Sequence, residues 1–108
     1  MSVENKEIID FISIDKSNKI VLTISDHLKW DNKDDHSLIL QDKINAYLEV
    51  IESGQIYDIY PDAKDKNFII QLAMKYKPNK RANDFLESIK LFLKNSNYEF
   101  KFYQLKED

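Results

Sequence analysis

Residues 25–37, "SDHLKWDNKDDHS", contain both histidines and the only tryptophan of the chain, together with four aspartates. Imidazole nitrogens and carboxylate oxygens suit zinc or manganese, so His27 and His36 with these aspartates form a candidate metal site. Against this, the stretch shows no i, i+4 ligand pair on one regular element, and it lacks the turn glycine of a calcium loop. A metal-binding protein or metal-assisted hydrolase is therefore only the second hypothesis. The aspartates concerned are Asp26, Asp31, Asp34 and Asp35.

The same stretch begins with residue types that acid–base catalysis uses. Asp26 and His27 follow a strand-like run, and a triad with Ser53 is an open alternative. A nucleophile must lie beside its base, but Ser25 points away from its neighbour on an extended chain, and Ser53 belongs to another element. A structural role is favoured: Asp26 accepts backbone N–H groups at the strand end, and His27 buries its ring there against a carboxylate. We therefore expect no catalytic residue and no enzyme.

Aromatic residues in two polar loops are the second kind of candidate. Trp30 either clamps its loop onto the core, which its large apolar ring favours, or stands exposed as a binding anchor. Tyr57 and Tyr60 raise the same choice in the segment that follows the first helix. If these three rings converge on one surface, they form an aromatic recognition patch of the kind that dominates interface energies.

Phosphate recognition is not favoured. The tract "KYKPNKR" at 75–81 is basic and holds a tyrosine, but it is short and reads as a solvated strand end and helix start. A chain with one glycine has no glycine-rich phosphate loop. The net charge of −3 gives no general attraction to nucleic acid or anionic lipid. We expect no nucleic-acid partner and no cofactor.

The bulk composition sets the class of protein. At 108 residues with 43% hydrophobic content, we expect a single globular domain over residues 1–108. Cysteine is absent, which excludes disulfides and thiolate metal sites and fits a reducing compartment. The N-terminal residues lack the apolar run of a signal peptide, and no 18-residue apolar stretch is present. A cytoplasmic protein with no membrane association is expected.

The hydrophobic periodicity predicts the elements that position these residues. Runs 8–15 and 19–26 are β-branched and form a hairpin around the polar turn 16–18. A helix over 36–53 follows from the apolar stripe that begins at Leu40, and Gly54 closes it. Residues 55–66 are expected to be a connection with a turn at Pro61.

The second half of the chain repeats this alternation of strand and helix. A strand over 67–77 alternates apolar and mixed positions, and Asn79 caps a helix that ends near 95–97. A last alternating run over 98–105 completes the order ββαβαβ. The predicted fold is α+β, with two helices packed on a four-stranded mixed sheet.

If both helices cover one face of that sheet, the other face remains partly apolar. Val21, Ile69 and Ala73 occupy it, and Ile9 and Phe11 are expected to join them. Exposed apolar patches usually mark partner surfaces, so a homodimer or another protein is expected to dock there.

Three phrases resemble one family closely. "ISDHLKW" (24–30), "INAYLEVIESGQIY" (44–57) and "YPD" (60–62) are similar to a small bacterial family of uncharacterised cytoplasmic proteins, a domain of unknown function. The resemblance is strong over roughly residues 8–77 and implies no activity. It draws attention to Gln55 and to Glu52, Ser53 and Gly54 without giving them a role. With the residues above, the candidate binding set is Asp26, His27, Trp30, Gln55, Tyr57 and Tyr60.

The first hypothesis for function is a non-enzymatic protein-binding module, acting as an immunity-type or regulatory partner. A small, acidic, cysteine-free chain without a catalytic motif fits such a role. A pocket for a small molecule between the helix 36–53 and the segment 55–66 is a third, weaker alternative.

Overall fold

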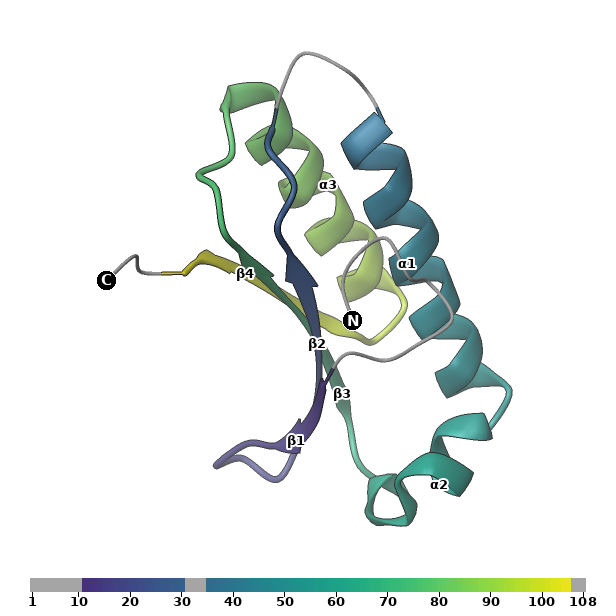
Figure 1. Cartoon of the computed structure of the whole chain (residues 1–108). Helices are drawn as coiled ribbons and strands as arrows, with labels where there is room; N and C mark the ends of the chain where they lie inside the picture. Colours follow the sequence, from purple (N-terminus) through teal and green to yellow (C-terminus); the bar gives the residue numbers. More distant parts are fainter. Residues whose placement is uncertain (1–10, 31–34, 106–108) are drawn as a thin grey trace.

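The computed structural model describes residues 11–30 and 35–105, and it shows a four-stranded sheet with helices on one side (Figure 1). Ile9, Asp31 and Asp34, which the sequence made candidates, lie outside the described residues. The elements in chain order are β1 (Phe11–Ile14), β2 (Ile20–Asp26), α1 (Asp35–Glu52), α2 (Gln55–Ile59), the 3-10 turn η1 (Pro61–Ala63), β3 (Phe68–Met74), α3 (Lys80–Asn95) and β4 (Glu99–Gln104).

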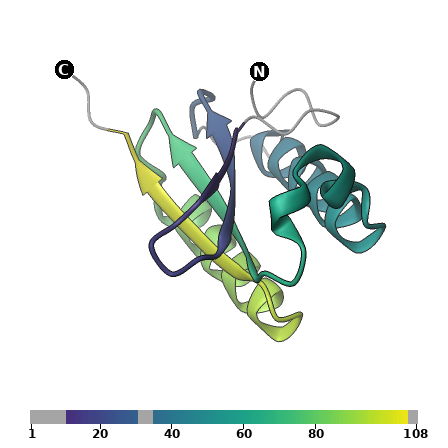
Figure 2. The ribbon, with the colours of Figure 1, turned by 90° about the horizontal axis from the view of Figure 1, so that it is seen from below.

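The strands lie side by side in their sequence order, β1-β2-β3-β4. β1 and β2 form the expected antiparallel hairpin, whereas β2, β3 and β4 run parallel to one another. Parallel neighbours need crossover connections, and α1 and α3 supply them. Both helices cover the same face of the sheet, as the two views show (Figures 1 and 2). The α+β fold with a mixed four-stranded sheet is thus confirmed.

The core forms because alternate strand residues point at the helices. In β2, Ile20, Leu22 and Ile24 are fully buried, and in β3 the same holds for Ile70 and Leu72. The apolar stripes of α1 and α3 close over them. The helix residues in this layer include Leu40, Ile44, Tyr47, Ile51, Leu86 and Leu93.

The segment after α1 differs from the expected connection, because it contains the short helix α2 and the turn η1. Gly54 stands between the two helices with φ at +85°, a left-handed conformation that glycine adopts without steric cost. This conformation ends α1 and redirects the chain, so that Ile56 becomes fully buried against the core. A five-residue helix is too short to produce a readable periodicity, which is why the sequence pattern did not predict it.

The described helices were examined for a possible membrane span. None of the helices in 11–30 and 35–105 is long and apolar enough to cross a membrane. The longest, α1, has 18 residues and carries charged side chains along its exposed side.

Candidate functional site

A buried hydrogen bond between a histidine and an aspartate joins the end of β2 to the beginning of α1. The Nε2 atom of His36 lies 2.5 Å from Oδ2 of Asp26, and both side chains are at least 95% buried. The Nδ1 atom of His36 lies 3.1 Å from the carbonyl oxygen of Lys29, so an imidazole that carries both protons donates to both oxygens. The other oxygen of Asp26 accepts the N–H of Leu28. This network fixes the loop that leaves β2.

Trp30 covers this pair. Its ring stacks on the His36 ring with centroids 3.6 Å apart and an angle of 19° between the planes. Trp30 is half-buried and packs against the hydrophobic core, so it clamps its loop. Its carbonyl accepts a hydrogen bond from Nδ2 of Asn79, the residue that caps α3, whereas its buried indole N–H has no hydrogen-bond partner among the described residues.

The histidine that is buried at the end of β2 is His36, whereas the sequence pattern predicted His27. His27 is exposed, and His36, ten residues after Asp26, provides the ring that meets the carboxylate. Whether these two residues would pair depended on where α1 begins, which spacing alone did not show.

The fold does not gather those candidate metal ligands that lie in the described part of the chain. Within 11–30 and 35–105, no three histidine, aspartate or glutamate side chains are close enough together to hold a metal ion. His36 uses both ring nitrogens in the contacts above, and His27 is exposed. The geometry of the described residues therefore lends the metal hypothesis no support.

The second half of the candidate binding set lies at the other end of α1. Trp30 is near the N-terminus of this helix, whereas Gln55, Tyr57 and Tyr60 follow its C-terminus (Figure 1). Eighteen helical residues span about 27 Å, so the three aromatic rings do not form one patch. The same separation places Ser53 far from Asp26, and the Oγ atom of Ser53 contacts the carbonyl of Val50 instead. The triad has no geometric basis.

One titratable group at this lower end is perturbed. Partial burial raises the pKa of the Tyr98 hydroxyl above its ordinary value of 10.0, and the negative charges of Glu52 and Tyr57 raise it further. Tyr98 leads into β4, whereas Glu52 ends α1 and Tyr57 lies in α2. These three side chains therefore bring together elements that are far apart in the sequence.

The face of the sheet opposite the helices carries the expected apolar residues, but most of them are buried. Val21, Ile69 and Ala73 lie on it, and each is less than 10% exposed. Phe11, opposite Thr23 on the edge strand β1, lies on the same face as expected and is 60% exposed. Thr23 and Gln71 form a hydrogen bond across the middle of this face. In the part of the chain that the structure describes, Val21, Ile69 and Ala73 do not form an exposed apolar patch, so the face gives no specific support to docking.

The edge of the sheet at β4 is a feature that the sequence analysis missed. Since β4 is the last strand in the sheet of the described residues, no strand among them lies along one side of its backbone. The N–H of Leu105 donates to the carbonyl of Met74 in β3, and hydrogen-bonding direction alternates along a strand. The backbone N–H and C=O groups of Phe100, Phe102 and Gln104 therefore point away from β3.

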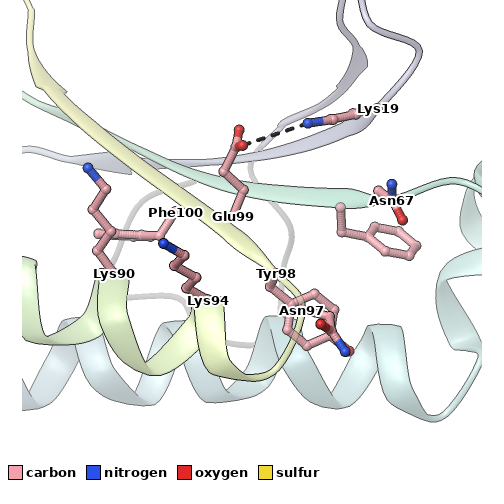
Figure 3. A pocket seen from close by; sticks show the side chains of 9 residues that line it. Lys19, Asn67, Lys90, Lys94, Asn97, Tyr98, Glu99 and Phe100 are labelled. Atoms are coloured by element: carbon pink, nitrogen blue, oxygen red, sulfur yellow. Dashed lines mark ion pairs between the residues drawn. The ribbon is translucent and has the colours of Figure 1, made fainter.

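Three hollows adjoin β4. The first is lined by residues 97–100 and the end of α3, together with Lys19, Asn67 and Phe68 at the beginnings of β2 and β3. The second is lined by residues from Glu99 to Tyr103 with Gln71 and Lys90, and the third by residues from Phe102 to Gln104 with the segment that leads into α3. Neighbouring hollows share lining residues, and we call the three together the β4 groove. The largest hollow, about 770 Å³, can accept side chains of a ligand (Figure 3).

The β4 groove is basic although the chain is acidic. Glu99 is the one acidic residue among those that line the three hollows. Glu99 is paired on both sides, 3.7 Å from Lys19 and 3.5 Å from Lys101. Lys90 and Lys94 project from α3 toward β4 (Figure 3). The lysines of the groove are Lys19, Lys77, Lys80, Lys90, Lys94 and Lys101.

Comparison with known proteins gives a family and no activity. The model of a family of unknown function, DUF6572, matches residues 1–106. No curated protein and no solved structure matches the chain. The resemblance inferred from the sequence phrases is confirmed as a family of unknown function, and this family supplies no residue roles.

Proposed function

Because the chain belongs to the DUF6572 family, whose function is unknown, we propose from its geometry that it is a non-enzymatic module that binds another protein. An immunity-type or regulatory role in the cytoplasm fits its small size and cysteine-free composition. The partner docks on the open edge of the sheet at β4. Docking of a homodimer or partner on the sheet face, which the sequence pattern favoured, is not part of this proposal.

The observation that carries this proposal is the combination of an uncovered strand edge and a groove along it. Exposed edges with unpaired N–H and C=O groups are templates for another strand, and folded proteins usually protect them. β4 offers three such residues over a six-residue strand, next to hollows that can receive side chains. Addition of a partner strand to a sheet edge is a recurrent mode of peptide recognition.

The test blocks the edge without disturbing the sheet. Gln104→Pro removes an N–H that points away from β3, and proline is tolerated at such edge positions. Gln104→Ala is the matched control, because it removes the same exposed side chain but keeps the N–H. Both variants are expected to unfold at similar denaturant concentrations to the wild type.

Tagged wild-type chain and both variants are expressed in the native host, and co-purifying proteins are quantified by mass spectrometry. We expect one protein to be recovered with the wild type and with Gln104→Ala, and to fall at least tenfold with Gln104→Pro. Recovery of the chain alone in all three preparations would contradict the proposal. A partner that Gln104→Pro retains fully would contradict the docking edge.

A further inference from the structure

We propose that the β4 groove recognises an extended acidic segment of the partner, which pairs with β4 as a fifth strand and places carboxylates beside Lys90 and Lys94. This inference rests on the proposed function and adds the chemistry of the partner to it. It follows from two independent properties of the groove, the direction of its backbone groups and the sign of its charge.

The outward backbone groups of β4 favour an extended peptide as the ligand. Outward N–H and C=O groups recur at Phe100, Phe102 and Gln104, with the two-residue period of a strand. An extended chain beside β4 presents complementary groups with the same period. Its side chains then alternate between the helix side of the sheet, where α3 lies, and the uncovered side.

The positive charge of the groove favours carboxylates on the side of the peptide that faces α3. Lys90 and Lys94 are four residues apart on α3, so they lie on one face of the helix, and both are exposed. Neither forms an ion pair with a described residue, whereas Lys19 and Lys101 on the uncovered side already bind Glu99. Side chains that an added strand sends toward α3 therefore meet two positive charges that no acidic residue of the described part of the chain neutralises. Acidic residues at every second position satisfy this arrangement.

A second copy of the chain fits the groove poorly. If β4 paired with β4 of another copy, the lysines of one groove would be brought toward the lysines of the other. Like charges that face one another across paired strands are destabilising. An acidic segment replaces this repulsion with attraction, which also accelerates encounter between partners.

Single-stranded nucleic acid would satisfy the lysines but not the rest of the groove. A phosphate backbone cannot pair with the alternating N–H and C=O groups of a strand edge. An extended acidic peptide can pair with the backbone groups of β4 and can also neutralise the lysines of the groove. It is therefore the ligand that both properties of the groove favour.

The experiment starts from a displayed library of random 12-residue peptides selected on the intact protein. We expect the selected peptides to be enriched in glutamate or aspartate at alternating positions. The strongest binder is then synthesised with a fluorescent label, and its dissociation constant is measured by anisotropy. A second synthetic peptide, with each acid replaced by its amide, is expected to bind at least tenfold more weakly.

Protein variants separate the role of charge from that of the edge. Lys90→Glu with Lys94→Glu is expected to weaken the acidic peptide at least tenfold. Lys16→Glu with Lys64→Glu makes the same change in net charge at exposed lysines that line none of the three hollows, so less than a twofold change is expected. Gln104→Pro is expected to weaken binding at least tenfold, and Gln104→Ala less than twofold.

Several results would overturn this inference. One is a library that yields no binder, or only binders without enrichment in acidic residues. Another is an equal loss of peptide affinity in the Lys90→Glu, Lys94→Glu variant and in the Lys16→Glu, Lys64→Glu control. Tighter binding of a labelled single-stranded oligonucleotide than of the peptide would assign the groove to nucleic acid. Dimerisation that Gln104→Pro abolishes would assign it to a second copy. Suppose that no acidic peptide binds, but a native partner co-purifies with the wild type and is lost with Gln104→Pro. That result would refute the recognition of an acidic segment and would leave the proposed function standing.

Discussion

At the scale of single residues, the contact between His36 and Asp26 has the largest energetic consequence. Both side chains are removed from water, and each depends on the other for a hydrogen-bond partner. Breaking such a pair from one side is far more costly than replacing both partners, because the remaining charge stays buried. The pair therefore holds the beginning of α1 against the end of β2 without adding much net stability.

His36→Leu leaves the Asp26 carboxyl buried without the imidazole that bonds to it, so we expect a loss of about 3 kcal/mol in the free energy of unfolding. The double replacement Asp26→Leu and His36→Leu is expected to be more stable than His36→Leu alone by about 1 kcal/mol or more. Urea unfolding of the three proteins measures both differences. A single replacement without effect, or strictly additive losses, would show that the two side chains are not coupled.

The raised pKa of Tyr98 predicts a dependence of stability on alkaline pH. The folded chain holds this proton to a higher pH than the unfolded chain does, because burial, Glu52 and Tyr57 disfavour the phenolate. As pH rises past about 10, the unfolded chain loses the proton first, and the free energy of unfolding falls. In Tyr98→Phe this contribution is absent. We expect stability curves from pH about 8 to about 11 to fall less steeply for the variant, and identical slopes would rule out Tyr98 as the source of the fall.

At the scale of elements, the turn between α1 and α2 depends on one backbone conformation. A Cβ atom at Gly54 would meet nothing closer than Cδ2 of Tyr57 at 3.8 Å, which is ordinary contact. The cost of a side chain there is therefore conformational and arises from the positive φ.

Gly54→Ala is expected to lower the free energy of unfolding by about 1 kcal/mol. Gly54→Asn is the matched control, since asparagine tolerates the left-handed region better than alanine, and a smaller loss is expected. Thermal or urea unfolding distinguishes the two. If alanine were tolerated as well as asparagine, α2 would not depend on this conformation.

At the scale of the whole molecule, the sequence pattern predicted most of the fold and little of the site. Apolar alternation located the strands, and the stripe that begins at Leu40 located α1, because burial on one face imposes a period. Periodicity does not report which strand lies at an edge, so the β4 groove was missed, and two of its lysines, Lys77 and Lys80, were interpreted as part of a solvated strand end and helix start. The pairing of His36 rather than His27 also depended on tertiary packing.

The same architecture predicts a pattern of amide hydrogen exchange. β2 and β3 are central and should exchange most slowly, since their opening requires the sheet to come apart. Within β4, the amides of Lys101 and Tyr103 point at β3, whereas those of Phe102 and Gln104 point away. We expect the outward amides to exchange at least tenfold faster in NMR measurements. Uniform protection along β4 would mean that its edge is already covered.

Because Trp30 stacks on His36, its fluorescence is an intrinsic probe of this part of the protein. An indole held against an imidazole emits differently from an indole in water, and the sequence contains no other tryptophan to obscure the signal. The Trp30 carbonyl is bonded to Asn79, which lines the far end of the β4 groove. Emission from this single ring can therefore follow unfolding, and it can register the arrival of a partner at that end without a label.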